Sequence, residues 1–265
     1  MDLTVSVLAS SSRANSTLIS CGDEALLIDA GLSCRETLRR CALAQPGLDP
    51  VAIRAICLTH EHADHIAGIR VLQKRLAVPI YGTYDTAQHA DRDGHLDWRY
   101  VQPSSPFHIG PFHVTAFRVP HDAHDPVGYR IECGGRTVAI ATDLGMPTAT
   151  VRQYLANADI LVLESNHEPS ILRSSGRTPD LIRRILSNQG HLSNDVCSGL
   201  LAELCQIRPP LHVLLAHLSS ECNDRRTALN TTTRRLAQEG FTSVQVRLTS
   251  PDEPVTVSLP LLRLC

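Results

Sequence analysis

The run Thr59-His60-Glu61-His62-Ala63-Asp64-His65 decides how the rest of this chain is interpreted. It follows the apolar stretch 55–58 and precedes 66–72, where apolar residues take helical spacing. His60 and His62 are two residues apart, so on extended backbone their rings point to the same side. Four potential ligands therefore gather at one strand-to-helix turn, and imidazole with carboxylate is a ligand set that zinc takes. The helix start adds backbone N–H groups, which favour an anionic substrate.

The composition favours a globular protein of a reducing cytoplasm. The chain has 265 residues, 43% of them hydrophobic, and we expect one domain over residues 1–265. No apolar run is long enough to cross a membrane and no export leader is recognisable, so we expect a cytoplasmic protein without membrane contact. Nine cysteines without a C-x-x-C pair favour reduced, buried thiols over disulfides or a thiolate zinc site. The net charge of −2, without a basic block, gives no support for a strongly basic nucleic-acid binder.

Apolar patterning predicts strands followed by helices, twice along the chain. The predicted strands are 3–8, 16–20, 25–28, 55–58, 78–81, 112–119, 127–133, 137–141, 160–163, 212–215, 243–248 and 255–259. Helices are predicted after Gly31, after the opening run, and near 148–157, 179–188, 195–206 and 224–238, whereas 85–111 and 164–178 are predicted to be irregular. This order favours an α/β fold in which two mixed β-sheets pack face to face with helices outside, an αββα four-layer sandwich.

The opening run also carries a family resemblance. His60-x-His62-x-Asp64-His65 resembles the signature of the metallo-β-lactamase-fold hydrolases. Three further candidates follow predicted strands, and they are His121, Asp143 and His217. The resemblance implies a first metal held by His60, His62 and His121, a second held by Asp64, His65 and His217, and Asp143 between the two. It also implies that Asp29 orients a ligand without contacting metal.

Five segments narrow the resemblance to the YycJ/WalJ subgroup of this fold. They are Ser10–Ser16, His121–Pro126, Glu164–His167, Gly190–Asn194 and His217–Asn223. Arg13-Ala14 departs from the small residues expected there, and Cys222 stands where a second asparagine is expected. The subgroup implies a 5′-to-3′ exonuclease that acts on DNA.

The predicted chemistry is phosphodiester hydrolysis by two divalent metals, zinc first, with manganese or iron as alternatives. Two metals about 3.5–4 Å apart lower the pKa of a shared water, whose hydroxide is the nucleophile, and Asp64 helps to hold this centre. His191, Ser193 and Asn194 form a predicted phosphate cradle at a helix start, near Asn166, and His167 is a candidate general acid. The plainer interpretation is that Ser193 or Asn194 caps the helix and His167 lies in a polar loop.

Two other functions stay open at this point. The same metal pair polarises a carbonyl, so a thioester, lactone or β-lactam hydrolase of glyoxalase II type fits the ligands equally well. A structural metal site is the non-enzymatic alternative, although such sites fill four positions around one metal, often with cysteine. The sequence carries no signal for a particular oligomeric state.

Overall fold

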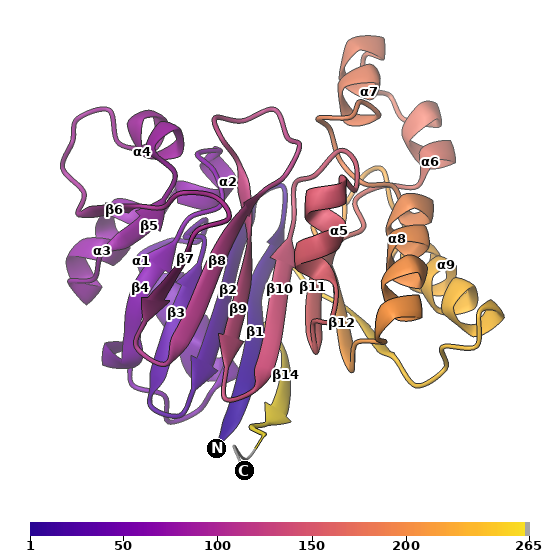
Figure 1. Ribbon diagram of the computed structural model, residues 1–265. Coiled ribbons are helices and arrows are strands. Elements are labelled where there is room, and N and C mark those ends of the chain that lie inside the picture. The colour runs from indigo at the N-terminus through magenta and orange to yellow at the C-terminus, as the bar shows by residue number, and fades with distance from the viewer. Residues whose placement is uncertain (263–265) are drawn as a thin grey trace.

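Buried strands run through both halves of the chain with apolar residues on both faces. Such strands need cover on both sides, which a second sheet and a layer of helices supply. The computed structural model, which describes residues 1–262, has two sheets packed face to face with helices on both outer faces (Figure 1). The predicted αββα sandwich is confirmed.

The first sheet combines strands from both ends of the described chain. In spatial order its seven strands within residues 1–262 are β14 (Val255–Pro260), β1 (Asp2–Ser11), β2 (Ala14–Cys21), β3 (Glu24–Ile28), β4 (Ile53–Cys57), β5 (Ile80–Gly82) and β6 (Trp98–Tyr100). Pairing is antiparallel from β14 to β3 and parallel from β3 to β6. Because β3 and β4 are parallel neighbours, the residues that follow them meet at one edge.

The second sheet has the same division into halves. In spatial order its seven strands within residues 1–262 are β13 (Gln245–Leu248), β12 (His212–Ala216), β11 (Ile160–Glu164), β10 (Arg136–Ala141), β9 (Val127–Cys133), β8 (Phe112–Arg118) and β7 (Pro106–Ile109). Pairing is parallel from β13 to β10 and antiparallel from β10 to β7. The carboxyl ends of β10, β11 and β12 therefore share an edge.

Helices cover the outer face of each sheet. Those that follow β3, β4 and β5 are α1 (Cys34–Ala44), the 3₁₀ turn η1 (Pro50–Ala52), α2 (Ala63–Ile66), α3 (Ile69–Leu76) and α4 (Tyr84–Ala90). Those in the second half are α5 (Ala149–Leu155), α6 (Pro169–Ser174), α7 (Pro179–Ile185), α8 (Asn194–Ile207) and α9 (Arg225–Gln238). Within residues 1–262, no helix has the length and apolar character needed to cross a membrane.

Three apolar layers hold the sandwich together. The central layer lies between the sheets and contains Phe112 and Tyr129, both fully buried. The second layer packs α5, α8 and α9 on the second sheet, and the third packs α1 and α3 on the first sheet. The Tyr129 hydroxyl donates a hydrogen bond of 2.7 Å to the Leu58 carbonyl, which ties β9 to the segment leading into the opening histidine run.

Two predicted irregular stretches contain regular structure. Residues 85–111 contain most of α4 and all of β6 and β7, and residues 164–178 contain α6. Arg99 and Tyr100 of β6 are exposed and Trp98 packs against the core, so this three-residue edge strand shows no alternating pattern that the sequence could reveal. The helix predicted after the opening run is divided into α2 and α3 around Gly68. The other predicted elements are present, with ends that differ by a few residues.

Two glycines let the loop after β3 touch the turn of α2. A Cβ on Gly31 would lie 1.8 Å from the Asp64 carbonyl oxygen, and one on Gly68 would lie 1.9 Å from the Leu32 oxygen. The Ala30 N–H donates to the His65 carbonyl at 2.7 Å in the same region. Only glycine permits this backbone approach, which fixes α2 against the first sheet.

We predict that Gly31→Ala destabilises the fold and displaces α2. The added methyl overlaps backbone that cannot move aside, and overpacking of this kind costs about 1–3 kcal/mol. Thermal unfolding should report a lower Tm and metal analysis a lower metal content. Gly199→Ala is the control, because its added Cβ meets no atom within 4 Å and alanine suits a helix interior. Equal Tm values for Gly31→Ala and the unmodified protein would contradict the prediction.

Candidate metal centre

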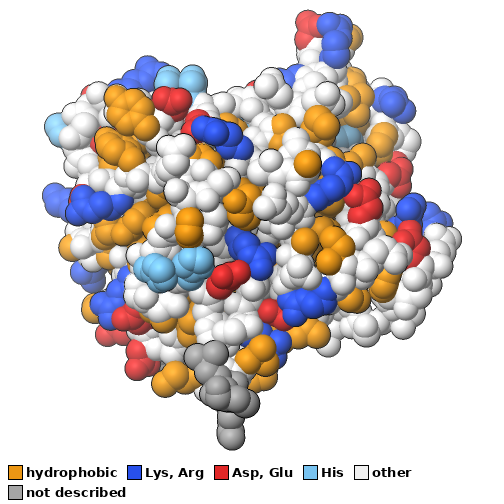
Figure 2. All heavy atoms as spheres, in the orientation of Figure 1, with side chains coloured by type: hydrophobic (Ala, Val, Ile, Leu, Met, Phe, Trp, Pro, Cys, Tyr) orange, Lys and Arg blue, Asp and Glu red, His pale blue; other side chains and the backbone are white. Residues whose placement is uncertain are grey.

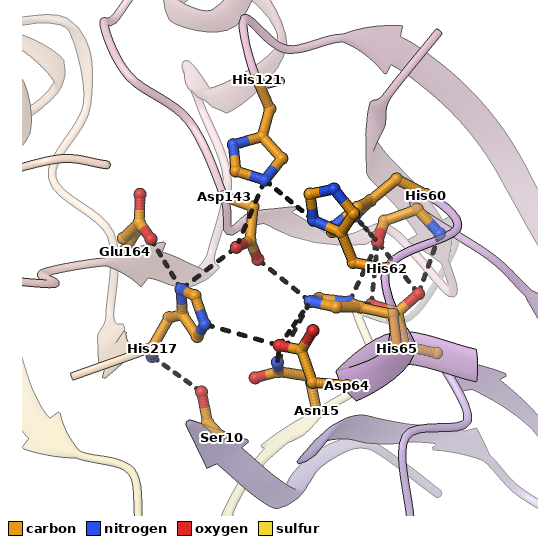
Figure 3. A network of polar contacts seen from close by, with 12 residues as sticks. Ser10, Asn15, His60, His62, Asp64, His65, His121, Asp143, Glu164 and His217 are labelled. Atoms are coloured by element: carbon orange, nitrogen blue, oxygen red, sulfur yellow. Dashed lines mark hydrogen bonds and ion pairs between the residues drawn. The ribbon is translucent and has the colours of Figure 1, made fainter. Parts of the chain in front are cut away.

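The predicted ligands meet where strands from the two sheets end at one rim. The opening run follows β4 and enters α2, with His62 at the helix N-cap and Asp64 and His65 inside the helix. The second sheet brings its contribution from four strand ends: His121 after β8, Asp143 after β10, Glu164 as the last residue of β11, and His217 after β12. Figure 3 shows these rings and carboxylates gathered around a common space.

The first group consists of His60, His62 and His121, whose candidate ligand atoms lie within 4.8 Å of one another. His121 Nε2 is 3.3 Å from His62 Nδ1, and its other ring nitrogen faces the Gly190 carbonyl at 3.2 Å. A carbonyl partner requires a proton on Nδ1, so Nε2 of His121 is the nitrogen available to a metal.

The second group surrounds Asp143. His65 Nε2 lies 3.2 Å from the Asp143 carboxylate and 3.4 Å from Asp64, and His217 Nε2 lies 3.8 Å from Asp64. His121 Nε2 is 3.8 Å from Asp143, so this one carboxylate borders both groups. Burial alone would raise the pKa of Asp143, but His217 and His65 hold it well below its ordinary value. Asp143 is therefore an anion between two sets of imidazoles.

The donor set fits divalent metal. Nε2 of His60 and Nε2 of His217 are buried, and within residues 1–262 neither has a hydrogen-bond partner. A buried polar atom without a partner is costly unless something else satisfies it, and a cation does so here. Imidazole nitrogens combined with carboxylate oxygens are ligands of zinc and of similar metals.

Asp29 orients His65 from behind. Its carboxylate accepts hydrogen bonds from the Thr59 backbone N–H at 2.8 Å and from the Thr59 hydroxyl at 3.0 Å, and it lies 2.8 Å from His65 Nδ1. With Nδ1–H donating to Asp29, Nε2 of His65 is turned toward Asp64 and Asp143.

Three site residues adopt left-handed backbone. Asp29, Asp143 and His217 follow strand ends with φ values of 60°, 56° and 53°. Such a conformation costs of order 1–3 kcal/mol for a residue with a Cβ and persists only where the surroundings impose it. The His217 N–H donates to the Ser10 hydroxyl at 2.7 Å, which is one such constraint.

Glu164 is a site residue that the sequence analysis did not single out. Its fully buried carboxylate lies 2.9 Å from His191 Nδ1 and 2.8 Å from His217 Nδ1 on one oxygen. The other oxygen accepts the Leu144 and Leu192 backbone N–H groups, each at 3.0 Å. Burial opposes ionisation, yet His191 and His217 lower the pKa of Glu164 to about 2.

The contacts of Glu164 indicate whether it binds an ion or positions its neighbours. Glu164, Asp143, His191 and His217 could also hold an ion, because their candidate ligand atoms lie within 4.8 Å. However, both oxygens of Glu164 already accept hydrogen bonds. We therefore interpret Glu164 as the acceptor that fixes the two histidine rings. In the sequence, the one feature that marks Glu164 is its position as a charged residue at the end of the otherwise apolar strand β11.

Asn15 is the second residue without a predicted role. Its amide nitrogen lies 3.0 Å from Asp64 and 3.1 Å from His65 Nε2, and it also donates to the Ser11 carbonyl. The amide thus links the turn after β1 to two ligands of α2. Nothing in its local sequence distinguishes it from an ordinary turn asparagine.

Several predicted substrate residues are placed differently. Ser193 caps α8 by accepting the Val196 N–H, and Asn194 is fully buried and bonded to the side chains of Ser165 and Asn223. Neither side chain is available as a phosphate cradle, so the plainer capping interpretation holds for this helix start. Asn166 donates to the His217 carbonyl at 2.8 Å.

His167 does not suit the predicted general-acid function. It is 1% exposed, and within residues 1–262 neither ring nitrogen has a hydrogen-bond partner. Burial lowers the pKa of His167 to about 4, so the ring is uncharged at neutral pH and is a poor proton donor. His191 differs: burial alone would lower its pKa, but Glu164 raises it to about 9.

The comparisons with known proteins agree with this geometry. Residues 24–218 match the family model described as the beta-lactamase superfamily domain. The chain belongs to the metallo-β-lactamase superfamily. Exodeoxyribonuclease YycJ of Bacillus anthracis is 31% identical over 265 residues, which cover 97% of this chain and 99% of that protein.

A second relative and one solved structure agree with this membership. Exodeoxyribonuclease WalJ of Streptococcus pneumoniae is 33% identical over 259 residues, which cover 93% of this chain and 94% of that protein. The crystal structure of the metallo-β-lactamase-fold protein YhfI from Bacillus subtilis superposes with a TM-score of 0.72 at 22% identity, covering 97% of this chain and 100% of that one. The chain is a YycJ/WalJ-like metal-dependent hydrolase.

We predict that metal uptake by the metal-free protein releases protons. Burial opposes protonation of His65, but Asp29 and Asp143 raise its pKa well above the ordinary value, and Asp143 and Glu164 raise that of His217. Both rings therefore hold a proton more tightly than a free imidazole does, and each must become neutral to bind metal. A zinc titration at pH 7 with a pH indicator should report roughly one to two protons released per chain.

The matched control is Asp29→Asn, which removes the carboxylate that raises the pKa of His65. Fewer protons should be released per metal bound in this variant. Because the protons compete with metal, metal affinity of the unmodified protein should also weaken as the pH falls. Metal uptake without any proton release would contradict the protonation states inferred here.

Proposed function

We propose that this chain is a dinuclear zinc phosphodiesterase that degrades DNA from strand ends in the 5′-to-3′ direction. The observation that carries the proposal is His191, a positively charged imidazole held by Glu164 beside the candidate metal ligands. The relatives that cover nearly the whole chain are named exodeoxyribonucleases, which supports DNA as the substrate. The ligand set draws on both sheets, so the enzyme acts as one domain.

In this proposal the two metals have the following ligands. His60, His62 and His121 would hold one zinc, and Asp64, His65 and His217 would hold the other. Asp143 would contact both, since it borders both groups. Bound there, the pair would supply an activated water and positive charge for the phosphate oxygens.

His191 is the residue that we assign to the proton transfer. Its Nδ1 is engaged by Glu164, so the opposite nitrogen, Nε2, is left for a ligand, and the side chain keeps 19% of its surface exposed. A protonated ring in this position neutralises charge on a phosphate oxygen and can give its proton to the leaving oxygen. Glu164 keeps the ring charged and oriented, which is a positioning function.

We predict that a substrate panel separates phosphodiester from carbonyl chemistry. The zinc-loaded protein should hydrolyse bis-p-nitrophenyl phosphate and labelled 5′-phosphorylated DNA, lose both activities with a chelator, and regain them with zinc. A glutathione thioester and a lactone should be turned over far more slowly. Carbonyl turnover without phosphodiester turnover would reverse the proposal in favour of a glyoxalase II-like enzyme, and no turnover of any substrate would favour a structural metal site.

We predict that His191→Ala lowers kcat for phosphodiester cleavage by about 10²–10⁴-fold while metal content is unchanged. His113→Ala is the control, since His113 lies on β8 and pairs with Glu132 on the neighbouring strand β9. The raised pKa means that His191 is protonated below about pH 9 and loses its proton above it. Bound metals add positive charge and move this step to lower pH. The unmodified enzyme should therefore show an alkaline fall in kcat that is absent in His191→Ala, and an identical profile in both would contradict the assignment.

A further inference from the structure

A cavity of about 110 Å³ adjoins the candidate metal centre on the side of α7. His191 and His217 form one wall of the cavity, and the polar remainder comes from Ser12, Asn166, Arg177, Arg184 and Ser219. In Figure 1, α6 and α7 stand above the rim of the second sheet. Arg177, Leu181, Arg184 and Ile185, from the segment between β11 and α8, form another wall of the cavity.

The charge of the cavity wall selects an anion. Two arginines line it, whereas none of its lining residues is an Asp or a Glu. Arg177 is held by Glu221 at 3.2 Å and Arg184 is held by Asp122, and both acids lie outside the lining. Nε of Arg177 is buried, and within residues 1–262 it has no hydrogen-bond partner. The acids thus anchor the arginines, and donors remain for a ligand.

The size of the cavity limits the ligand to a small group. Pockets for drug-sized ligands are about 300–1,000 Å³, so this volume suits one phosphate and not a nucleoside. A terminal phosphate monoester carries about −1.5 to −2 charge at pH 7, more than the single charge of an internal phosphodiester. Two guanidiniums in a confined space therefore favour a strand end over an internal phosphate.

Acidic and basic side chains are interspersed on the face seen in Figure 2, without an extended basic field. This face therefore has no broad positive surface that could steer a whole duplex toward the protein. Local recognition in a cationic cavity is the alternative source of affinity.

We propose that this cavity binds the terminal 5′-phosphate of a DNA strand and thereby selects ends for cleavage. The proposal rests on the function proposed above and adds to it the group that is recognised. Arg177 and Arg184 hold the terminal phosphate while the neighbouring phosphodiester lies at the metal centre. A strand that continues past this point has no phosphate monoester to place in the cavity.

The test compares two labelled DNA substrates that differ only in a 5′-phosphate or a 5′-hydroxyl. The unmodified enzyme should prefer the 5′-phosphate by about tenfold or more in kcat/KM, as expected for a lost charge-assisted contact. Arg177→Ala and Arg184→Ala should each reduce this preference toward one. Arg183→Ala is the matched control. Arg183 lies next to Arg184 on α7, is largely exposed and pairs with Asp180, outside the cavity.

Binding to metal-free protein supplies a readout that does not depend on catalysis. Thymidine 5′-monophosphate should bind the unmodified protein and Arg183→Ala alike, and about tenfold more weakly to Arg177→Ala. Arg177→Lys keeps the charge but loses the planar fork, so intermediate affinity is expected. Inorganic phosphate and a 3′-phosphorylated strand are tested in the same binding assay. Comparing their affinities with that of thymidine 5′-monophosphate distinguishes recognition of a 5′ end from recognition of free phosphate or of a 3′ end.

The failures of the two proposals are distinguishable. If the unmodified enzyme does not hydrolyse bis-p-nitrophenyl phosphate, the proposed function fails. If it does hydrolyse that ester but cleaves both DNA substrates equally, or if Arg177→Ala and Arg184→Ala keep the full preference, the 5′-phosphate site is overturned. Circular dichroism and metal content of each variant separate loss of recognition from loss of folding.

Discussion

A buried cluster of histidines and carboxylates, placed where the two sheets meet, is the constraint on which the rest of this structure depends. Isolated charges in such a place cost several kcal/mol each, so every one needs a partner. His65 lies between Asp29 and Asp143, and His217 lies between Asp143 and Glu164. Some buried nitrogens of the cluster, including Nε2 of His60, still lack a hydrogen-bond partner within residues 1–262, and these are the atoms that a bound cation would contact.

The framework around the cluster is correspondingly rigid. Gly31 allows backbone contact between a loop and α2, and the Tyr129 hydroxyl secures the segment before the histidine run. Asp143 and His217 tolerate left-handed backbone because their neighbours hold them. These candidate ligands are thus positioned by contacts that reach back into the sheets.

Much of this could be predicted from the sequence because the information is local. The histidine run is contiguous, and strand ends such as that before His217 are marked by apolar runs. Glu164 could not be assigned because its importance comes from residues 27 and 53 positions away. The start of α8 was ambiguous for another reason: a serine before a helix has the same pattern whether it caps the helix or binds phosphate, and here Ser193 forms a cap. At β6 the irregular prediction for 85–111 failed because a three-residue strand with two exposed side chains carries no alternating pattern.

The position of β14 has a consequence for how the protein is made. Its residues pair with β1, as in the contact between Thr4 and Ser258, 254 positions apart. Contacts this distant in sequence form late, because the loop-closure entropy must be overcome before they contribute. During synthesis the histidine run leaves the ribosome long before His217 and before the strand that completes its own sheet. The growing chain therefore exposes several candidate metal ligands before the remaining ones have been synthesised.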